Sequence, residues 1–262
     1  MIIDAHTHIY PSKIAQKAVE SVREFYHVPE MYGGEGTSEN LLRCAASAGV
    51  DRCVVCSVAV KPATVESINT FIAGECAAHP EFIGLMAMHQ DYEDPEKEIE
   101  RGITAGLKGI KFHPDTQRVN ADDPRIMDVY AICESKGIAV LIHTGDYRYD
   151  FSHPRRIREI CRAFPELRVE AAHFGGWSVY DIGYDTLRDV DCWVDTSSAL
   201  EMTGVRHGRE LINLFGSDRV LFGSDFPMWH PAKEAAMLKE MGLDKQAFEC
   251  VAHKNAEELY RL

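Results

Sequence analysis

The sequence lacks a surplus of positive charge. Its 262 residues include 28 Lys and Arg against 41 Asp and Glu, which gives a formal net charge of −13. A surface of this sign repels phosphate backbones and anionic lipid headgroups. The composition therefore favours a small-molecule substrate and argues against a nucleic-acid or membrane partner.

Long apolar stretches are also missing. No segment reaches the roughly 18 apolar residues of a membrane span, and the N-terminus has no basic segment followed by an apolar run. We therefore expect a cytoplasmic protein whose eight cysteines are reduced thiols. Cys53 and Cys56 form a single CxxC inside an apolar run, where a buried strand is favoured over a redox or zinc site.

Short apolar runs alternate with amphipathic helical stretches along the whole chain, a pattern typical of repeated βα units. The length is close to the roughly 250 residues of a closed α/β barrel. We therefore predict a single-domain (β/α)8 TIM barrel over residues 1–262. The eight expected strands are Ile2–Ala5, Arg52–Val58, Ile83–Met88, Gly109–Phe112, Ala139–Ile142, Arg168–Ala171, Cys192–Val194 and Val220–Phe222.

The segment Tyr10–Thr37 between the first strand and its helix is much longer than an ordinary βα loop. We expect this extended insertion to fold over the barrel mouth. Its aromatic residues could line a substrate pocket, with Gly33-Gly34 and Gly36 as a hinge. A helical insertion over about Lys13–Phe25 that packs on the barrel rim is an equally good interpretation.

Potential metal ligands follow several expected strands. His6 and His8 lie two residues apart, so a strand projects both imidazoles from one face. His143, His173 and Asp225 end three other strands, and barrel enzymes assemble their active sites at that end. Imidazole and carboxylate donors without cysteine predict one catalytic divalent ion, Zn²⁺ first, with Mn²⁺, Fe²⁺, Co²⁺ or Ni²⁺ as alternatives.

Six motifs together resemble the amidohydrolase superfamily, in the branch of aminocarboxymuconate-semialdehyde decarboxylase-like and pyrone-dicarboxylate lactonase-like proteins. They are Asp4-Ala-His-Thr-His, Gly109-Ile-Lys-Phe-His-Pro, Ile142-His-Thr-Gly, Ala172-His-Phe-Gly-Gly, Phe222-Gly-Ser-Asp-Phe-Pro and Asn255-Ala-Glu-Glu-Leu-Tyr. The resemblance implies that His6, His8, His143 and Asp225 hold one metal ion. It also implies that His173 is an acid/base group.

Four further residues are candidate substrate contacts: Lys111, His113, Arg148 and Trp177. Each has a plainer alternative. Lys111 could pack under the site or, as a carbamylated bridge, hold a second metal ion. His113 and Arg148 could be ordinary loop residues, and Trp177 could cap the barrel.

We expect hydrolysis of an amide, lactone or ester, with Asp225 taking the proton of metal-activated water and His173 stabilising the oxyanion. The alternative is non-oxidative decarboxylation of an unsaturated or aromatic acid, because the same ligands serve both reactions. A nuclease or an inactive metal-binding regulator is disfavoured. Substrate identity and a homodimeric state stay open.

Overall fold

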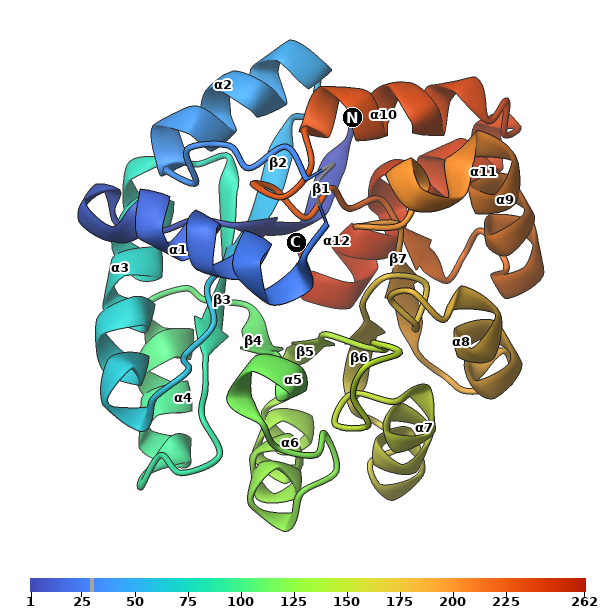
Figure 1. The fold of residues 1–262 in the computed structure, drawn as a ribbon. Coiled ribbons are helices and arrows are strands. Elements are labelled where there is room, and N and C mark those ends of the chain that lie inside the picture. The colour runs from blue at the N-terminus through green and yellow to red at the C-terminus, as the bar shows by residue number, and fades with distance from the viewer. Residues whose placement is uncertain (29–30) are drawn as a thin grey trace.

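The computed structural model describes residues 1–28 and 31–262, and its centre is one ring of eight parallel strands. The strands pair in chain order from β1 to β8, with helices around the outside (Figure 1). They are β1 (Ile3–His8), β2 (Arg52–Cys56), β3 (Phe82–Ala87), β4 (Gly109–Phe112), β5 (Ala139–Ile142), β6 (Arg168–Ala171), β7 (Trp193–Asp195) and β8 (Val220–Leu221). The predicted TIM barrel is confirmed, and β4, β5 and β6 have the predicted bounds.

The barrel closes through the segment that follows β8. Thr7 forms a parallel bridge with Phe226, and the His8 amide donates to the Phe226 carbonyl at 2.6 Å. The Asp225 amide donates to the His6 carbonyl at 2.8 Å. Closure of the barrel therefore brings Asp225 beside the end of β1.

Proline sets the start of many outer helices. Among the described residues, five α-helices begin at a proline, whose fixed φ suits the first helical position. The helices after the first are α2 (Ser38–Ala48), α3 (Val65–Ala78), α4 (Pro95–Thr104), α5 (Pro114–Gln117), α6 (Pro124–Lys136), α7 (Pro154–Ala163), α8 (Tyr180–Leu187), α9 (Leu200–Phe215), α10 (Pro231–Glu240), α11 (Lys245–Glu249) and α12 (Asn255–Tyr260). In the described residues, no helix is both long enough and apolar enough to cross a bilayer.

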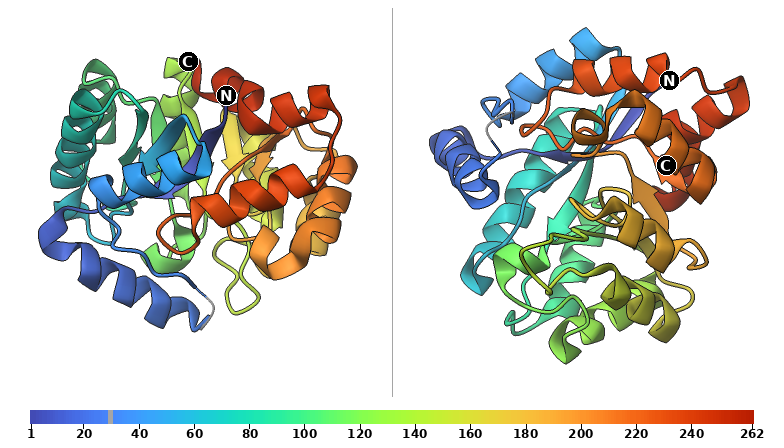
Figure 2. Two further views of the ribbon diagram at one scale, coloured as in Figure 1. Left: turned by 90° about the horizontal axis from the view of Figure 1, so that it is seen from above. Right: turned by 45° about the vertical axis from the view of Figure 1, so that its right-hand side comes forward.

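The long insertion after β1 contains helix α1 (Ser12–Tyr26), which lies across the barrel in Figure 1 and along its outside in Figure 2. α1 buries only Ala15 and Val19. The chain then returns with the Tyr32 amide bonded to the Met228 carbonyl at 2.7 Å. The expected insertion is therefore present as a helix, and its Pro29 and Glu30 lie outside the described residues.

Two large clusters of buried side chains make up most of the core. Side chains of Ile3, Leu85 and Leu141 fill the inside of the barrel with others, and a larger cluster joins the strands to the helices. Tyr260 of α12 closes the barrel at the end opposite the mouth, where its hydroxyl bonds the buried Glu170 carboxyl. Cys53 and Cys56 are buried free thiols of β2, as expected for a core strand.

Substitution of Leu85 tests the packing of side chains inside the barrel. Its side chain is fully buried among strand residues, so Leu85→Ala should lower the free energy of unfolding by about 2–5 kcal/mol. Leu214→Ala, at a side chain that is 53% exposed on α9, should change it by less than about 0.5 kcal/mol. Urea unfolding measures both, and equal losses would contradict the described core.

Candidate metal centre

The end of β1 and the loop after β8 bring three donors together. His6, His8 and Asp225 each offer one ligand atom, and these atoms lie within 4.8 Å of one another. Asp225 Oδ1 is 3.2 Å from His8 Nε2 and 3.7 Å from His6 Nε2. The Asp225 carboxylate is held by the Ser198 hydroxyl on its other oxygen, Oδ2. Three of the predicted ligands therefore form one compact group.

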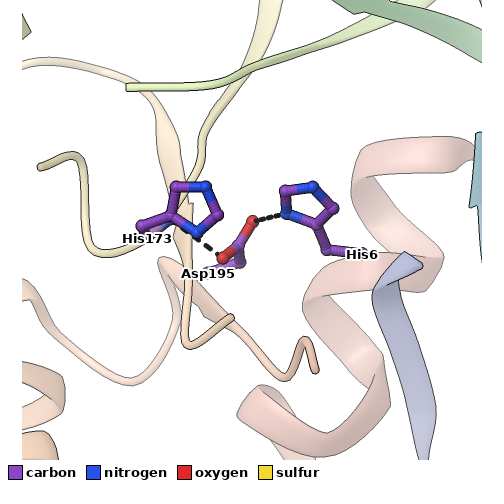
Figure 3. A group of neighbouring side chains, drawn as sticks. All are labelled: His6, His173 and Asp195. Carbon is purple, nitrogen blue, oxygen red and sulfur yellow. Dashed lines mark hydrogen bonds and ion pairs between the residues drawn. The ribbon is translucent and has the colours of Figure 1, made fainter. Parts of the chain in front are cut away.

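Asp195 at the end of β7 fixes the orientation of His6. Its Oδ2 lies 3.0 Å from His6 Nδ1, and its Oδ1 accepts the backbone N–H groups of His173 and Ser197 at 3.0 and 2.9 Å. Figure 3 shows Asp195 between the His6 and His173 rings. Because a carboxylate can only accept, the proton of His6 is assigned to Nδ1 and the lone pair to Nε2.

Cys56 plays the corresponding role for His8. The thiol donates to the Thr7 carbonyl at 3.4 Å, so its sulfur is free to accept from His8 Nδ1 at 3.5 Å. The inward Nε2 faces the Asp225 oxygen at 3.2 Å and carries a proton toward it at neutral pH, because the Cys56 and Asp225 contacts raise the pKa of His8 to about 9 against the effect of burial. A divalent ion would take the place of that proton between the nitrogen and the carboxylate oxygen. The donor set therefore fits a divalent ion.

His143 and His173 form a second inward-facing pair. His173 Nδ1 donates to the Ser197 carbonyl at 2.8 Å, which leaves its Nε2 3.0 Å from His143 Nδ1. The outer Nε2 of His143 lies 3.3 Å from Asp115, a contact without hydrogen-bond geometry. The structure thus places His143 beside His173, with Asp115 behind it, rather than within the His6, His8 and Asp225 group.

Burial and neighbouring charges set the protonation of the centre. Burial and the nearby Lys111 lower the pKa of His6 to about 4, while burial and His143 lower that of His173 to about 3. Burial opposes a charge on Asp225, yet the surrounding histidines hold its pKa well below the usual range. His6 and His173 are therefore neutral and Asp225 is ionised, as metal binding requires. Burial opposes a charge on His8, but the Cys56 and Asp225 contacts raise its pKa to about 9, so an incoming metal ion must displace a proton from His8.

Lys111 reaches the centre from β4 inside the barrel. Its side chain is buried, and Nζ lies 2.8 Å from His6 Nε2. Nζ therefore uses the same His6 lone pair that a bound metal ion would need. An ion held by His6 requires the Lys111 ammonium to move aside, close to the ion and to any anion bound there.

The other predicted substrate contacts line the mouth below the end of α1. The Tyr26 hydroxyl lies 2.7 Å from His113 Nε2, and its ring centroid is 4.7 Å from that of Trp177. The Arg148 guanidinium is largely occupied, because it bonds the Asp146 carboxylate and donates to the Phe25 carbonyl at 2.6 Å. Arg148 thus ties the end of α1 to the loop after β5.

Sequence reasoning passed over two acidic residues of this site. Asp195 ends β7, so the position that singled out His143 and His173 also applied to it. Asp115 gave no such signal, because it lies one residue beyond the proline that starts the short helix α5. Asp195 contacts His6, and Asp115 contacts His143. The partners in each pair are distant in sequence, so only the fold reveals the contact.

Comparison with known proteins assigns the chain to a family, since residues 3–262 match the amidohydrolase family. This chain is an amidohydrolase-family protein. It is 28% identical over 198 residues to the 2-amino-3-carboxymuconate-6-semialdehyde decarboxylase of Dictyostelium discoideum, an alignment that covers 61% of the chain and 55% of that relative. The chain thus spans about half the length of this relative.

Two solved structures share the fold over the whole chain. The 5-carboxyvanillate decarboxylase of Sphingomonas paucimobilis has a TM-score of 0.78 at 19% identity, covering 100% of this chain and 99% of that one. The 5-carboxyvanillate decarboxylase of Novosphingobium aromaticivorans, complexed with manganese and 4-hydroxy-3-methoxy-5-nitrobenzoic acid, has a TM-score of 0.78 at 18% identity, covering 100% and 96%.

These relatives correct the expected reaction. The expectation of a hydrolase was wrong, because the curated relative and both of these structures are decarboxylases. The error has a physical reason: the same histidine and carboxylate donors support either reaction, so the ligand pattern does not distinguish C–C from C–O or C–N cleavage.

Asp195 provides a test of the centre that needs no substrate. Asp195→Asn removes the charge that orients His6, so the affinity for Zn²⁺ should fall about 10- to 100-fold. A competition titration with a chromophoric chelator measures this change. Asp191→Asn, an exposed position just before β7, is the control and should bind Zn²⁺ like the wild type. If both variants bound Zn²⁺ with equal affinity, Asp195 would have no role in the metal centre.

Asp4, near the start of β1, gives a pH prediction. Burial, opposed by bonds from Ser224, raises its pKa from 3.8 to about 7. Between these values the folded state holds a proton that the unfolded state has lost, so this group makes stability fall as pH rises. At about 1.4 kcal/mol per pKa unit, the effect is at most roughly 4 kcal/mol.

Replacement of this carboxyl should remove the pH effect. Relative to the wild type, Asp4→Asn should become progressively more stable in urea unfolding between pH 4 and pH 8. The exposed Asp185→Asn should show no such trend. A constant difference between Asp4→Asn and wild type across this range would show that Asp4 is not protonated in the folded state.

Proposed function

We propose that this protein is a divalent-metal-dependent decarboxylase of an unsaturated or aromatic carboxylic acid. The observation that carries this proposal is the likeness to a curated decarboxylase over 198 residues, joined to a buried group of histidine and aspartate donors at the mouth of the barrel. Two solved decarboxylases with the same fold add support.

The proposed ligands are His6, His8, His143 and Asp225. Zn²⁺ is our first choice for three imidazoles and a carboxylate, and Mn²⁺ is the alternative because it is bound in the Novosphingobium aromaticivorans decarboxylase. When bound, the ion supplies a Lewis acid that holds substrate oxygens and stabilises negative charge left by the departing CO₂. His143 Nδ1 already faces inward, 3.0 Å from His173.

His173 is the proposed proton donor to carbon. In the reaction the bond between the substrate carbon and its carboxylate breaks, CO₂ leaves, and the carbon takes up one proton. The Ser197 carbonyl holds His173 Nδ1, which leaves Nε2 beside His143 Nδ1 at 3.0 Å. His173 is neutral in the free protein because of its low pKa, and an anionic substrate beside it would favour its protonation.

Other residues would bind and orient the substrate. The Lys111 ammonium is the only lysine nitrogen that the described residues bring to His6, and we assign it to the substrate carboxylate. The Trp177 ring, beside Tyr26, would form a wall on the side of α1, and a flat wall suits a planar substrate. Arg148 would affect substrate binding indirectly, by holding the end of α1 in place.

The reaction is tested by product analysis. Metal-loaded protein should release CO₂ from at least one member of a panel of unsaturated and hydroxylated aromatic acids, without release of any additional acid. His173→Gln should keep its metal content and lose about 10²- to 10⁴-fold in kcat. Acid release from lactones or amides without CO₂ would refute the proposal.

A further inference from the structure

Tyr26 stands where the insertion meets the metal centre. It is the last residue of α1, and its hydroxyl reaches His113 Nε2 at 2.7 Å. Its ring lies near those of Trp177 and His143, at centroid distances of 4.7 and 6.1 Å. The backbone just before it is fixed by the bond from Arg148 to the Phe25 carbonyl. The hydroxyl is therefore held in place at the mouth.

The proton of this hydroxyl can be located from the bonds of His113. His113 is the N-cap of α5, and its Nδ1 accepts the backbone N–H of Thr116 at 3.5 Å. An imidazole that accepts at Nδ1 carries its proton on Nε2. His113 Nε2 then donates to Tyr26, so the phenolic oxygen is the acceptor in this contact.

The phenolic proton is consequently free for another acceptor. Within residues 1–28 and 31–262, the Tyr26 hydroxyl forms no hydrogen bond other than the one to His113. Burial and the Asp225 carboxylate raise the pKa of Tyr26 well above its usual value, in keeping with a hydroxyl close to the metal-ligand aspartate. A hydroxyl donor at the mouth that has no acceptor is available to an acceptor supplied by a bound ligand.

We propose that Tyr26 is a substrate-binding residue whose O–H donates to an anionic oxygen of the substrate, while His113 orients it from behind. The inference rests on the proposed decarboxylase function for the nature of the substrate. It assigns a specificity role to the insertion after β1, which supplies Tyr26, and it makes His113 a positioning residue rather than a direct contact.

The tautomer of His113 is the first test, and it needs no substrate. Long-range ¹H–¹⁵N NMR of the Zn²⁺-loaded, ¹⁵N-histidine-labelled protein distinguishes the two neutral forms, with His113→Gln used to assign the resonance. We expect the proton on Nε2. A proton on Nδ1 would overturn the proposal, because Tyr26 would then have to donate to His113.

Ligand binding is the second test. The probe is 4-hydroxy-3-methoxy-5-nitrobenzoic acid, an anionic nitrophenol whose visible absorbance reports its binding to the metal-loaded protein. Tyr26→Phe should weaken binding about 10- to 100-fold, the size of a hydrogen bond to a charged group. Tyr147→Phe, at a mouth-side residue that is 74% exposed, should bind within about twofold of the wild type.

A double-variant cycle then links the two residues. His113→Phe removes the group that orients the hydroxyl, so it should cost most of what Tyr26→Phe costs, and the double variant should lose little more. Additive losses, or wild-type affinity in Tyr26→Phe, would refute the proposal. A wild-type protein that fails to bind the probe would count against the aromatic-acid function, while the tautomer measurement would still decide the role of Tyr26.

Discussion

The centre depends on one arrangement: outer acceptors hold one nitrogen of each key imidazole so that the other faces inward. Asp195 holds His6, Cys56 holds His8, and the Ser197 carbonyl holds His173. These acceptors come from β7, β2 and the loop after β7, so the pattern requires the closed barrel. It leaves the inner nitrogens of His6 and His8 facing the Asp225 carboxylate at 3.7 and 3.2 Å, a position where a cation would be stabilised.

Charge inside the barrel is organised around the same centre. Lys111, Asp195 and Glu170 occupy inward positions on β4, β7 and β6, within a lining that is otherwise largely apolar. Burial, with the charge of Asp195 next, raises the pKa of Glu170 well above its usual value. A protonated Glu170 lowers the negative charge beneath the site, which leaves Asp195 as the ionised partner of His6.

Much of the fold could be predicted from the sequence, because alternation of apolar runs with helical periodicity reports βα repeats directly. Strand positions set His6, His8 and Asp225 at one rim, and the structure brings these three together. Asp195 could have been found by its strand-end position. Asp115 has no such local pattern, and the CxxC that contains Cys56 indicated only a buried strand, so these two partners could not be predicted. The type of reaction was also beyond reach, because the ligands are common to hydrolysis and decarboxylation.

The most direct test of the account is a crystal structure of the Zn²⁺-loaded protein with anomalous diffraction data collected at the zinc edge. The account predicts one ion bound by His6 Nε2, His8 Nε2, Asp225 Oδ1 and His143 Nδ1, with Lys111 moved off His6. The described residues also contain a second group of possible ligands, His113, Asp115 and His143, which shares His143 with the predicted set. An ion bound there, with His6 still held by Lys111, would contradict the account.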